Sequence, residues 1–224
     1  MTTTTATSTE ELVRLTVQQL ADGMRHVATA NTFVSAAARG KLTSLGIEAV
    51  VRLESATLTN VTACLDLAAA RFGTGEGAGF MREMARLVAV DLAGIRAAEH
   101  DLGITPELHP GHQLPSVAYG YPGFINWLCL HADPAAIALV AHTDLLLWHD
   151  ACALLTPALR AHGGLPTSVV DYFASYEQRP DEALELAVDL AVRAVDGGAD
   201  LHRATDVARL MEGHLAAFWR TLDH

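Results

Sequence analysis

Two carboxylates stand out because each interrupts an otherwise apolar helix face. Between residues 133 and 161, apolar side chains recur at the spacing of a helix, and Asp144 lies in the middle of their stripe. Between residues 43 and 72 the same spacing recurs, with Glu54 at the centre. Burying a carboxylate costs free energy unless the group is paired or used. Glu54 and Asp144 are therefore the candidate catalytic residues, and cation binding or proton transfer is the chemistry that suits them.

Further candidates follow from the positions of these two acids. Trp148 stands one helical turn after Asp144, and Glu99 continues an apolar stripe to the last turn of a helix expected over residues 80–99. Large aromatic side chains are core residues by default, but they become pocket walls if the two acids face one cavity. This applies to Trp148, Tyr172, Tyr176, Phe218 and Trp219. The alternative interpretation of the two acids is a structural hydrogen bond between core helices.

The histidines do not predict a metal site. His142 and His149 fall on the helix side opposite Asp144, and His202 stands four residues before Asp206 near the start of a predicted helix. No histidine pairs with two acids at ligand spacing, so we expect no metal and no cofactor. The sequence also lacks a glycine-rich phosphate loop, a GxSxG turn and an HExxH helix. This argues against nucleotide binding and the commonest hydrolase arrangements.

The composition favours helices in a cytoplasmic protein. Half of the 224 residues are hydrophobic and only 6% are aromatic. The net charge of −11 argues against nucleic acid or an anionic membrane surface as a partner. The three cysteines lie in apolar segments without CxxC spacing, which is typical of reduced core thiols. We expect no signal peptide, and no uninterrupted apolar run reaches membrane-spanning length.

Helix signals account for most of the chain. Ser8 and Glu11 form a capping box that predicts a helix over residues 9–29, after a disordered lead at residues 1–7. Further helices are expected over residues 33–38, 43–72, 80–99, 123–132, 133–161, 167–178, 181–195 and 200–222. The long loop between residues 100 and 118 carries His109 and His112, which either cover a pocket or are solvated. Because no strand pattern, repeat or linker is present, we expect one all-α domain over residues 1–224, with about eight to nine helices.

Three stretches resemble the thiaminase II (TenA) and PqqC-like group of the haem-oxygenase-like fold. They are residues 31–55 (NTFVSAAARGKLTSLGIEAVVRLES), the region from Tyr121 to Leu155, and residues 209–223 (RLMEGHLAAFWRTLD). The order and lengths of the predicted helices between them also fit, so the resemblance covers nearly the whole chain. It implies a single haem-oxygenase-like helical bundle with a central pocket. Because members of the family form dimers and tetramers, it also implies a homo-oligomer.

Some of the family's site residues have a residue of the same kind at the matching position of this sequence, and others do not. The pocket aspartate that holds the aminopyrimidine in the family corresponds to Glu54 here. The catalytic cysteine, and the tyrosine four residues after it, correspond to Asp144 and Trp148. The family's pocket tyrosines correspond to Tyr172 or Tyr176, and Tyr121 opens the second matching region. The resemblance therefore implies a pocket whose acid is retained and whose nucleophile is replaced.

The last helix departs from the family in the same way. The family's catalytic glutamate aligns with Leu215, while Glu212 and His214 lie on the flanks of that helix. Without the cysteine and the glutamate, we do not expect thiaminase hydrolysis. The substrate-binding candidates are thus Trp148, Tyr172, Tyr176, Glu212, His214, Trp219, Tyr121 and Glu99.

These observations predict a small-molecule enzyme of a specialised biosynthetic pathway. Two acids in an aromatic pocket suit a cationic, amine-bearing substrate and cofactor-independent acid–base chemistry, by hydrolysis, elimination or ring closure. One alternative is a non-catalytic binding or accessory protein that serves a partner protein of the pathway. A second alternative is a non-haem iron oxidase of the same fold. However, Tyr176, Pro180 and Ala183 occupy the positions where such enzymes keep ligands.

Overall fold

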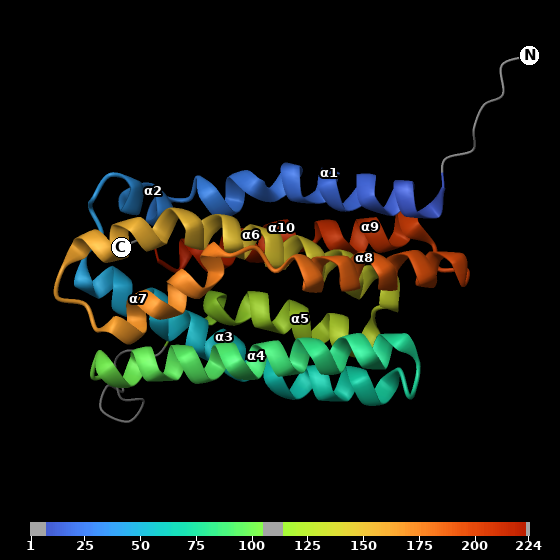
Figure 1. The fold of residues 1–224 in the computed structure, drawn as a ribbon, viewed down its shortest axis with the longest axis horizontal. Coiled ribbons are helices and arrows are strands. Elements are labelled where there is room, and N and C mark those ends of the chain that lie inside the picture. Colours follow the sequence, from blue (N-terminus) through green and yellow to red (C-terminus); the bar gives the residue numbers. More distant parts are fainter. Residues whose placement is uncertain (1–7, 105–113, 223–224) are drawn as a thin grey trace, which may run out of the picture.

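The computed structural model describes residues 8–104 and 114–222, which form an all-α bundle without a β-strand (Figure 1). The all-α fold class predicted from the sequence is confirmed. In chain order the helices are α1 (Thr9–Thr29), α2 (Thr32–Ala38), α3 (Ser44–Arg71), α4 (Glu76–Asp101), the 3-10 helix η1 (Ser116–Tyr119), α5 (Gly120–His131), α6 (Pro134–His162), α7 (Thr167–Ala174), the 3-10 helix η2 (Ser175–Glu177), α8 (Asp181–Asp196), α9 (Leu201–Arg209) and α10 (Met211–Arg220). The predicted lead at residues 1–7, together with His109 and His112, lies outside the described residues.

Local signals in the sequence fix the first helices. The Ser8 side chain accepts a hydrogen bond from the Glu11 backbone at 3.2 Å, and the Glu11 carboxylate accepts one from the Ser8 backbone at 2.9 Å. This reciprocal pair is the predicted capping box, and it satisfies backbone donors that the first helical turn leaves unpaired. After α2, Gly40 adopts a φ of 65°, a left-handed conformation that costs glycine little.

The fourth helix begins earlier than predicted. The helices expected over residues 43–72 and 80–99 leave the glycine-rich residues 73–79 between them without helical structure, but α4 already starts at Glu76. Only Gly73 has a positive φ there, at 69°. A Cβ on Gly77 would lie 3.2 Å from the Phe72 ring, so the missing side chain lets the first turn of α4 pack against that ring.

The helix predicted over residues 200–222 is two helices, α9 and α10. They meet at Leu210, whose backbone N–H bonds to the Val207 carbonyl at 3.1 Å, as in a tight helical turn. Both halves contact α1, but α9 otherwise packs mainly on α6 whereas α10 packs mainly on α5.

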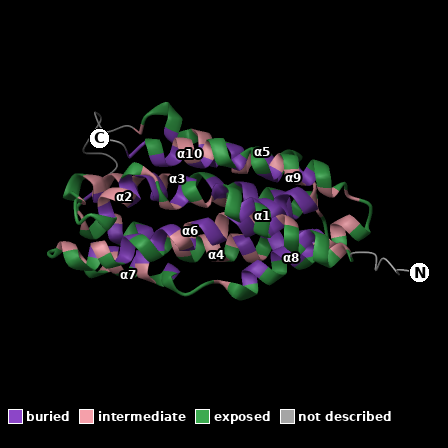
Figure 2. Cartoon of the chain, turned by 90° about the horizontal axis from the view of Figure 1, so that it is seen from above, coloured by how far each residue is buried: buried purple, intermediate pink, exposed green. Residues whose placement is uncertain are grey.

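The helix α6 runs through the middle of the bundle (Figures 1 and 2). Its backbone packs against α1, α8 and α9, and the α3–α4 hairpin lies on its other side. By length and composition alone α6 would suffice to cross a membrane, since an 18-residue window has a mean hydropathy of 1.2. The sequence analysis considered only uninterrupted apolar runs, and α6 is interrupted by polar residues such as His142, Asp144 and Asp150. More than half of this window, 56%, is buried inside the bundle, as in the core helix of a soluble protein.

Candidate functional site

A cavity of about 170 Å³ lies between α6 and the α3–α4 hairpin. Glu54 from α3 and Asp144 from α6 both line it, together with side chains of α5 and α10. The two acids predicted from helical periodicity therefore face one space. Among the described residues that line the cavity there is no lysine or arginine beside these carboxyls.

Glu54 is buried, with 6% of its surface exposed. The Tyr172 hydroxyl donates a hydrogen bond to Glu54 Oε1 at 3.1 Å. Burial disfavours the charged form and raises the pKa of Glu54 to about 8, although the Tyr172 hydrogen bond opposes this shift. The nearby Asp91 and Asp144 raise the pKa of Glu54 further. At neutral pH, Glu54 thus carries its proton in most molecules.

Asp144 reaches the cavity from α6 and accepts a hydrogen bond from the Tyr121 hydroxyl. Burial raises the pKa of Asp144 to about 6, and the Tyr121 hydrogen bond opposes this shift. Tyr121 is itself buried, and burial followed by the charge of Asp144 raises the pKa of its hydroxyl. Tyr121 therefore remains a hydrogen-bond donor at any physiological pH, and Asp144 is mostly ionised at neutral pH.

A third acid of the cavity, Asp91 on α4, was missed by the sequence analysis. Burial raises the pKa of Asp91 to about 6, and the nearby Tyr176 hydroxyl opposes this shift. Helical spacing could have indicated Asp91, since it follows Val88 by three residues and precedes Ile95 by four, which puts all three on one helix face. The predicted stripe ran instead through Leu92, one position further on.

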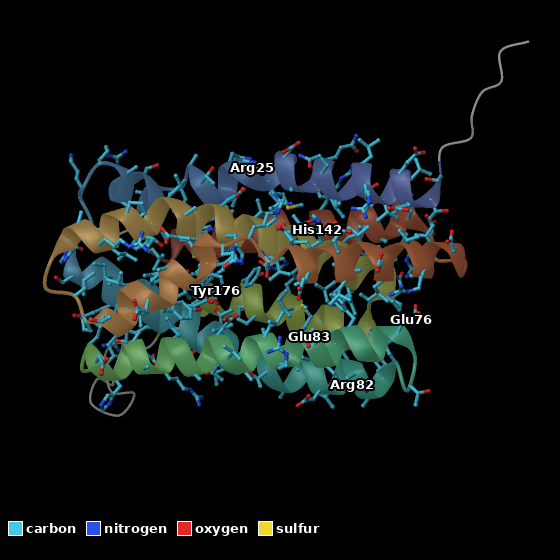
Figure 3. All side chains as sticks on the ribbon, in the orientation of Figure 1. Arg25, Glu76, Arg82, Glu83, His142 and Tyr176 are labelled. Atoms are coloured by element: carbon cyan, nitrogen blue, oxygen red, sulfur yellow. The ribbon has the colours of Figure 1, made fainter. Side chains whose placement is uncertain are left out.

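Two tyrosine hydroxyls connect Glu54 with Asp91. The hydroxyls of Tyr176 and Tyr172 lie 3.2 Å apart, Tyr172 bonds to Glu54, and Tyr176 interacts with the Asp91 carboxyl. In Figure 3, Tyr176 lies between the ribbons of α6 and α4. Hydroxyl hydrogens rotate to suit their partners. The same chain can therefore be oriented from Glu54 toward Asp91 or from Asp91 toward Glu54, depending on which carboxyl holds the proton.

Aromatic rings close the acidic part of the cavity. Trp148, Tyr176 and Phe218 line it, and the Trp148 ring meets the Tyr176 ring edge to face at 5.9 Å between centroids. Trp219 stacks behind Trp148 at 6.0 Å, so it supports the wall without lining the cavity. Tyr172 likewise acts through its hydrogen bond to Glu54, outside the lining residues.

Besides Tyr172 and Trp219, three predicted site residues do not line the cavity. Glu99 accepts a hydrogen bond from Ser55 at 2.7 Å at the far end of α4, two turns beyond Asp91. Glu212 is half exposed and lies 3.8 Å from His26 on α1. His214 stacks on the Phe124 ring at 4.7 Å. Glu212 and His214 lie beside the buried face of α10, as helical periodicity indicated; they became candidates because the family's catalytic glutamate aligns with the neighbouring Leu215.

The histidines do not gather around the acids. His142 and His149 are buried on the other side of α6, and His202 pairs with Asp206 at 3.2 Å with 83% of its side chain exposed. Across residues 8–104 and 114–222, no three His, Cys, Asp or Glu side chains are arranged to hold a metal ion. Within these two ranges, the residues offer no ligand set for the iron centre of the alternative oxidase.

The comparisons with known proteins concern the fold. No protein-family model and no curated protein matches the sequence. Among solved structures, a TenA homologue protein from P. horikoshii OT3 matches with a TM-score of 0.69 and 16% sequence identity. The match covers 96% of this chain and 98% of that chain. The predicted resemblance is confirmed at the level of structure: this chain has the haem-oxygenase-like fold of a TenA homologue, in a strongly diverged sequence.

Proposed function

We propose that this protein is a small-molecule enzyme that performs metal-free acid–base chemistry on a cationic amine. One observation carries the proposal. Glu54 and Asp144 line the same cavity, yet their pKa values, about 8 and about 6, lie on opposite sides of neutral. Two carboxyl groups held in opposite protonation states are the arrangement by which enzymes assign one acid and one base.

The roles of the two acids follow from these protonation states. Asp144, ionised, accepts a proton from the substrate ammonium for ring closure, from a water molecule for hydrolysis, or from the carbon next to the one that bears the leaving group for elimination. The freed nitrogen or hydroxide then attacks, or an adjacent bond breaks, and Glu54 donates its proton to the departing group. The proton on Asp144 returns to Glu54 to close the cycle. Hydrolysis, elimination and ring closure all fit this sequence of proton transfers.

The surroundings support a cation as the bound species. Asp91 adds a third carboxyl to the same part of the cavity, and the lining offers no positive side chain. The faces of Trp148, Tyr176 and Phe218 favour a nearby ammonium through cation–π attraction. A bound cation would also lower the pKa values of the acids, so its binding should release protons.

We further propose a cytoplasmic location and a homo-oligomer. The three cysteines are free and buried, which suits a reducing compartment. Exposed apolar side chains on α5, Trp127 and Leu130, offer a surface for self-association. Light scattering at micromolar concentration tests the second point, and a monomer would contradict it. An accessory role beside a partner protein of a biosynthetic pathway remains the alternative if the bound amine is never turned over.

A calorimetric titration with benzylamine and benzyl alcohol tests the proposal. The two probes have the same shape, but only the amine carries a charge. We expect benzylamine to bind roughly 10 to 100 times more tightly, because a hydrogen bond to a charged group contributes about 1.5–3 kcal/mol. Glu54→Gln and Asp144→Asn should remove most of this preference. Glu99→Gln, outside the cavity, is the matched control. Equal binding of alcohol and amine by the wild-type protein would contradict the proposal.

A further inference from the structure

We propose that the substrate is an amphiphilic monoamine that binds in one direction. Its nitrogen lies among Glu54, Asp91 and Asp144, and a single apolar body, the size of one ring or about six carbons, extends toward Leu65 and Phe80. The inference rests on the proposed amine chemistry and adds the shape, the polarity and the orientation of the ligand.

The first support is the order of residues along α3 and α6. On α3 the cavity lining begins at Glu54 and ends at Leu65, eleven positions later, which is about 16 Å at the rise of an α-helix. On α6 it begins at Ile137 and ends at Asp144 and Trp148. Each helix thus has its acid toward one end of its lining segment and an aliphatic side chain at the other.

The helices α4 and α5 show the same polarity. The helix α4 runs back beside α3, so Asp91 lies near Glu54 while Phe80 lies near Leu65 (Figure 1). On α5 the lining begins at Tyr121, which bonds to Asp144, and ends at Leu128 and Cys129. All four helices therefore place their acids and hydroxyls at one end of the cavity, here called the acid end. The other end, lined by Leu65, Phe80, Leu128 and Ile137, is here called the apolar end.

The volume of the cavity limits the size of the ligand's apolar body. At about 170 Å³ it is comparable to an engineered apolar cavity of about 150 Å³ that binds benzene. A single ring or a short hydrocarbon chain fills such a space, whereas a ligand with several rings exceeds it. Each methylene buried at the apolar end should increase affinity roughly fourfold.

The apolar end also excludes a second charge. An ammonium placed there would lose its water without meeting a carboxylate, which strongly disfavours binding. A diamine of matching length is therefore expected to bind less well than the monoamine, although it has more charge to offer to an acidic protein. This comparison separates directional binding from simple attraction of cations.

The test is calorimetric titration of the wild-type protein with propylamine, hexylamine, hexane-1,6-diamine and hexan-1-ol. We expect hexylamine to bind roughly 60 times more tightly than propylamine, from three added methylenes. The diamine should bind at least about tenfold more weakly than hexylamine. A diamine that binds as tightly as hexylamine, or a propylamine that does so, overturns the inference and leaves the proposed amine chemistry standing. Hexan-1-ol binding as tightly as hexylamine would instead refute the proposed function itself.

A pair of variants on α3 gives an independent readout. Leu65 is buried at the apolar end, with 6% exposure, whereas Leu67 on the same helix is 57% exposed. Leu65→Phe should shorten the space and lower hexylamine affinity by about tenfold or more, with propylamine affinity little changed. Leu67→Phe is the matched control and should change neither. Equal effects of Leu65→Phe on both amines, in a protein that still unfolds cooperatively, would contradict the assigned orientation.

Discussion

The two sides of α6 bury titratable groups in different ways. On the cavity side, Asp144 accepts a hydrogen bond from Tyr121 and its pKa is raised to about 6. On the side that packs toward α1 and α8, His142 is buried and its pKa is lowered to about 4, first by burial and then by the charge of Arg179. The Nδ1 atoms of His142 and His149 have no hydrogen-bond partner within the described part of the chain.

The difference shows what a cavity adds to burial. Burial alone pushes both groups toward their neutral forms, which are the acid for Asp144 and the base for His142. The hydrogen bond from Tyr121 offsets part of this effect, so Asp144 still titrates close to neutral pH. His142 lacks such a bond and stays neutral throughout the physiological range. Of the two, only Asp144 can exchange a proton with a ligand under working conditions.

The largest expected effect is on turnover, where the two sides of α6 should differ completely. Asp144→Asn should lower kcat by roughly 10²- to 10⁴-fold, the range for loss of a general acid or base. Glu54→Gln should do the same, since it removes the proton donor. His142→Gln should change kcat by no more than about twofold. The measurement uses the amine that the binding assay selects as substrate.

Thermal unfolding of these variants tells a catalytic role from a structural one. If Glu54 and Asp144 serve function, neutral replacements should leave the Tm unchanged or raise it. Asp144→Asn removes a buried charge from the empty protein, and Glu54→Gln replaces a carboxyl that is already mostly neutral. Variants that lose several degrees in Tm and still turn over the substrate normally would show that the acids are structural.

A smaller effect concerns stability against pH, and the two sides should have opposite signs. Asp144 has a folded pKa of about 6, above its ordinary 3.8, so its contribution to stability is present at low pH and is lost as pH rises through that interval. His142 has a folded pKa of about 4, below its ordinary 6.5, so its contribution is present above 6.5 and is lost as pH falls through 4.

Thermal melts between about pH 4 and 7 check these signs. The Tm difference between Asp144→Asn and the wild type should increase with pH by a few degrees, and that of His142→Gln should decrease. Parallel pH dependences of the two variants would show that the sides of α6 do not differ as described.

The smallest effect is expected at Glu212, a predicted substrate-binding residue that does not line the cavity. Glu212 and His26 form an exposed pair on α10 and α1. Glu212→Gln should therefore change the free energy of unfolding by less than about 0.5 kcal/mol and leave amine binding unaltered. A loss of binding comparable to that of Asp144→Asn would mean that the cavity extends from Leu215 and Phe218 to the exposed face of α10, where Glu212 lies.

Most of the fold and part of the site could be predicted from the sequence. Helical periodicity gave the extents of α1, α3 and α6 and pointed to Glu54 and Asp144. The same rule missed Asp91, because Leu92 next to it made an equally plausible stripe. A single helix offers several overlapping apolar stripes, and only its packing against neighbours selects one of them.

What the sequence determined by itself is local: which segments are helical, where they begin, and which positions on each helix place an acid among apolar side chains. The helical period, capping boxes and glycine conformations act within a few residues, so the chain alone suffices to read them. The partners of the acids were decided only by the tertiary structure. Tyr172 reaches Glu54 across 118 residues of chain, and Asp91 faces the same space from α4. Such meetings depend on how whole helices cross and rotate, as the break between α9 and α10 shows. The desolvation that sets the acids' pKa values, and the polarity of the cavity from its acid end to its apolar end, exist only once those helices have packed.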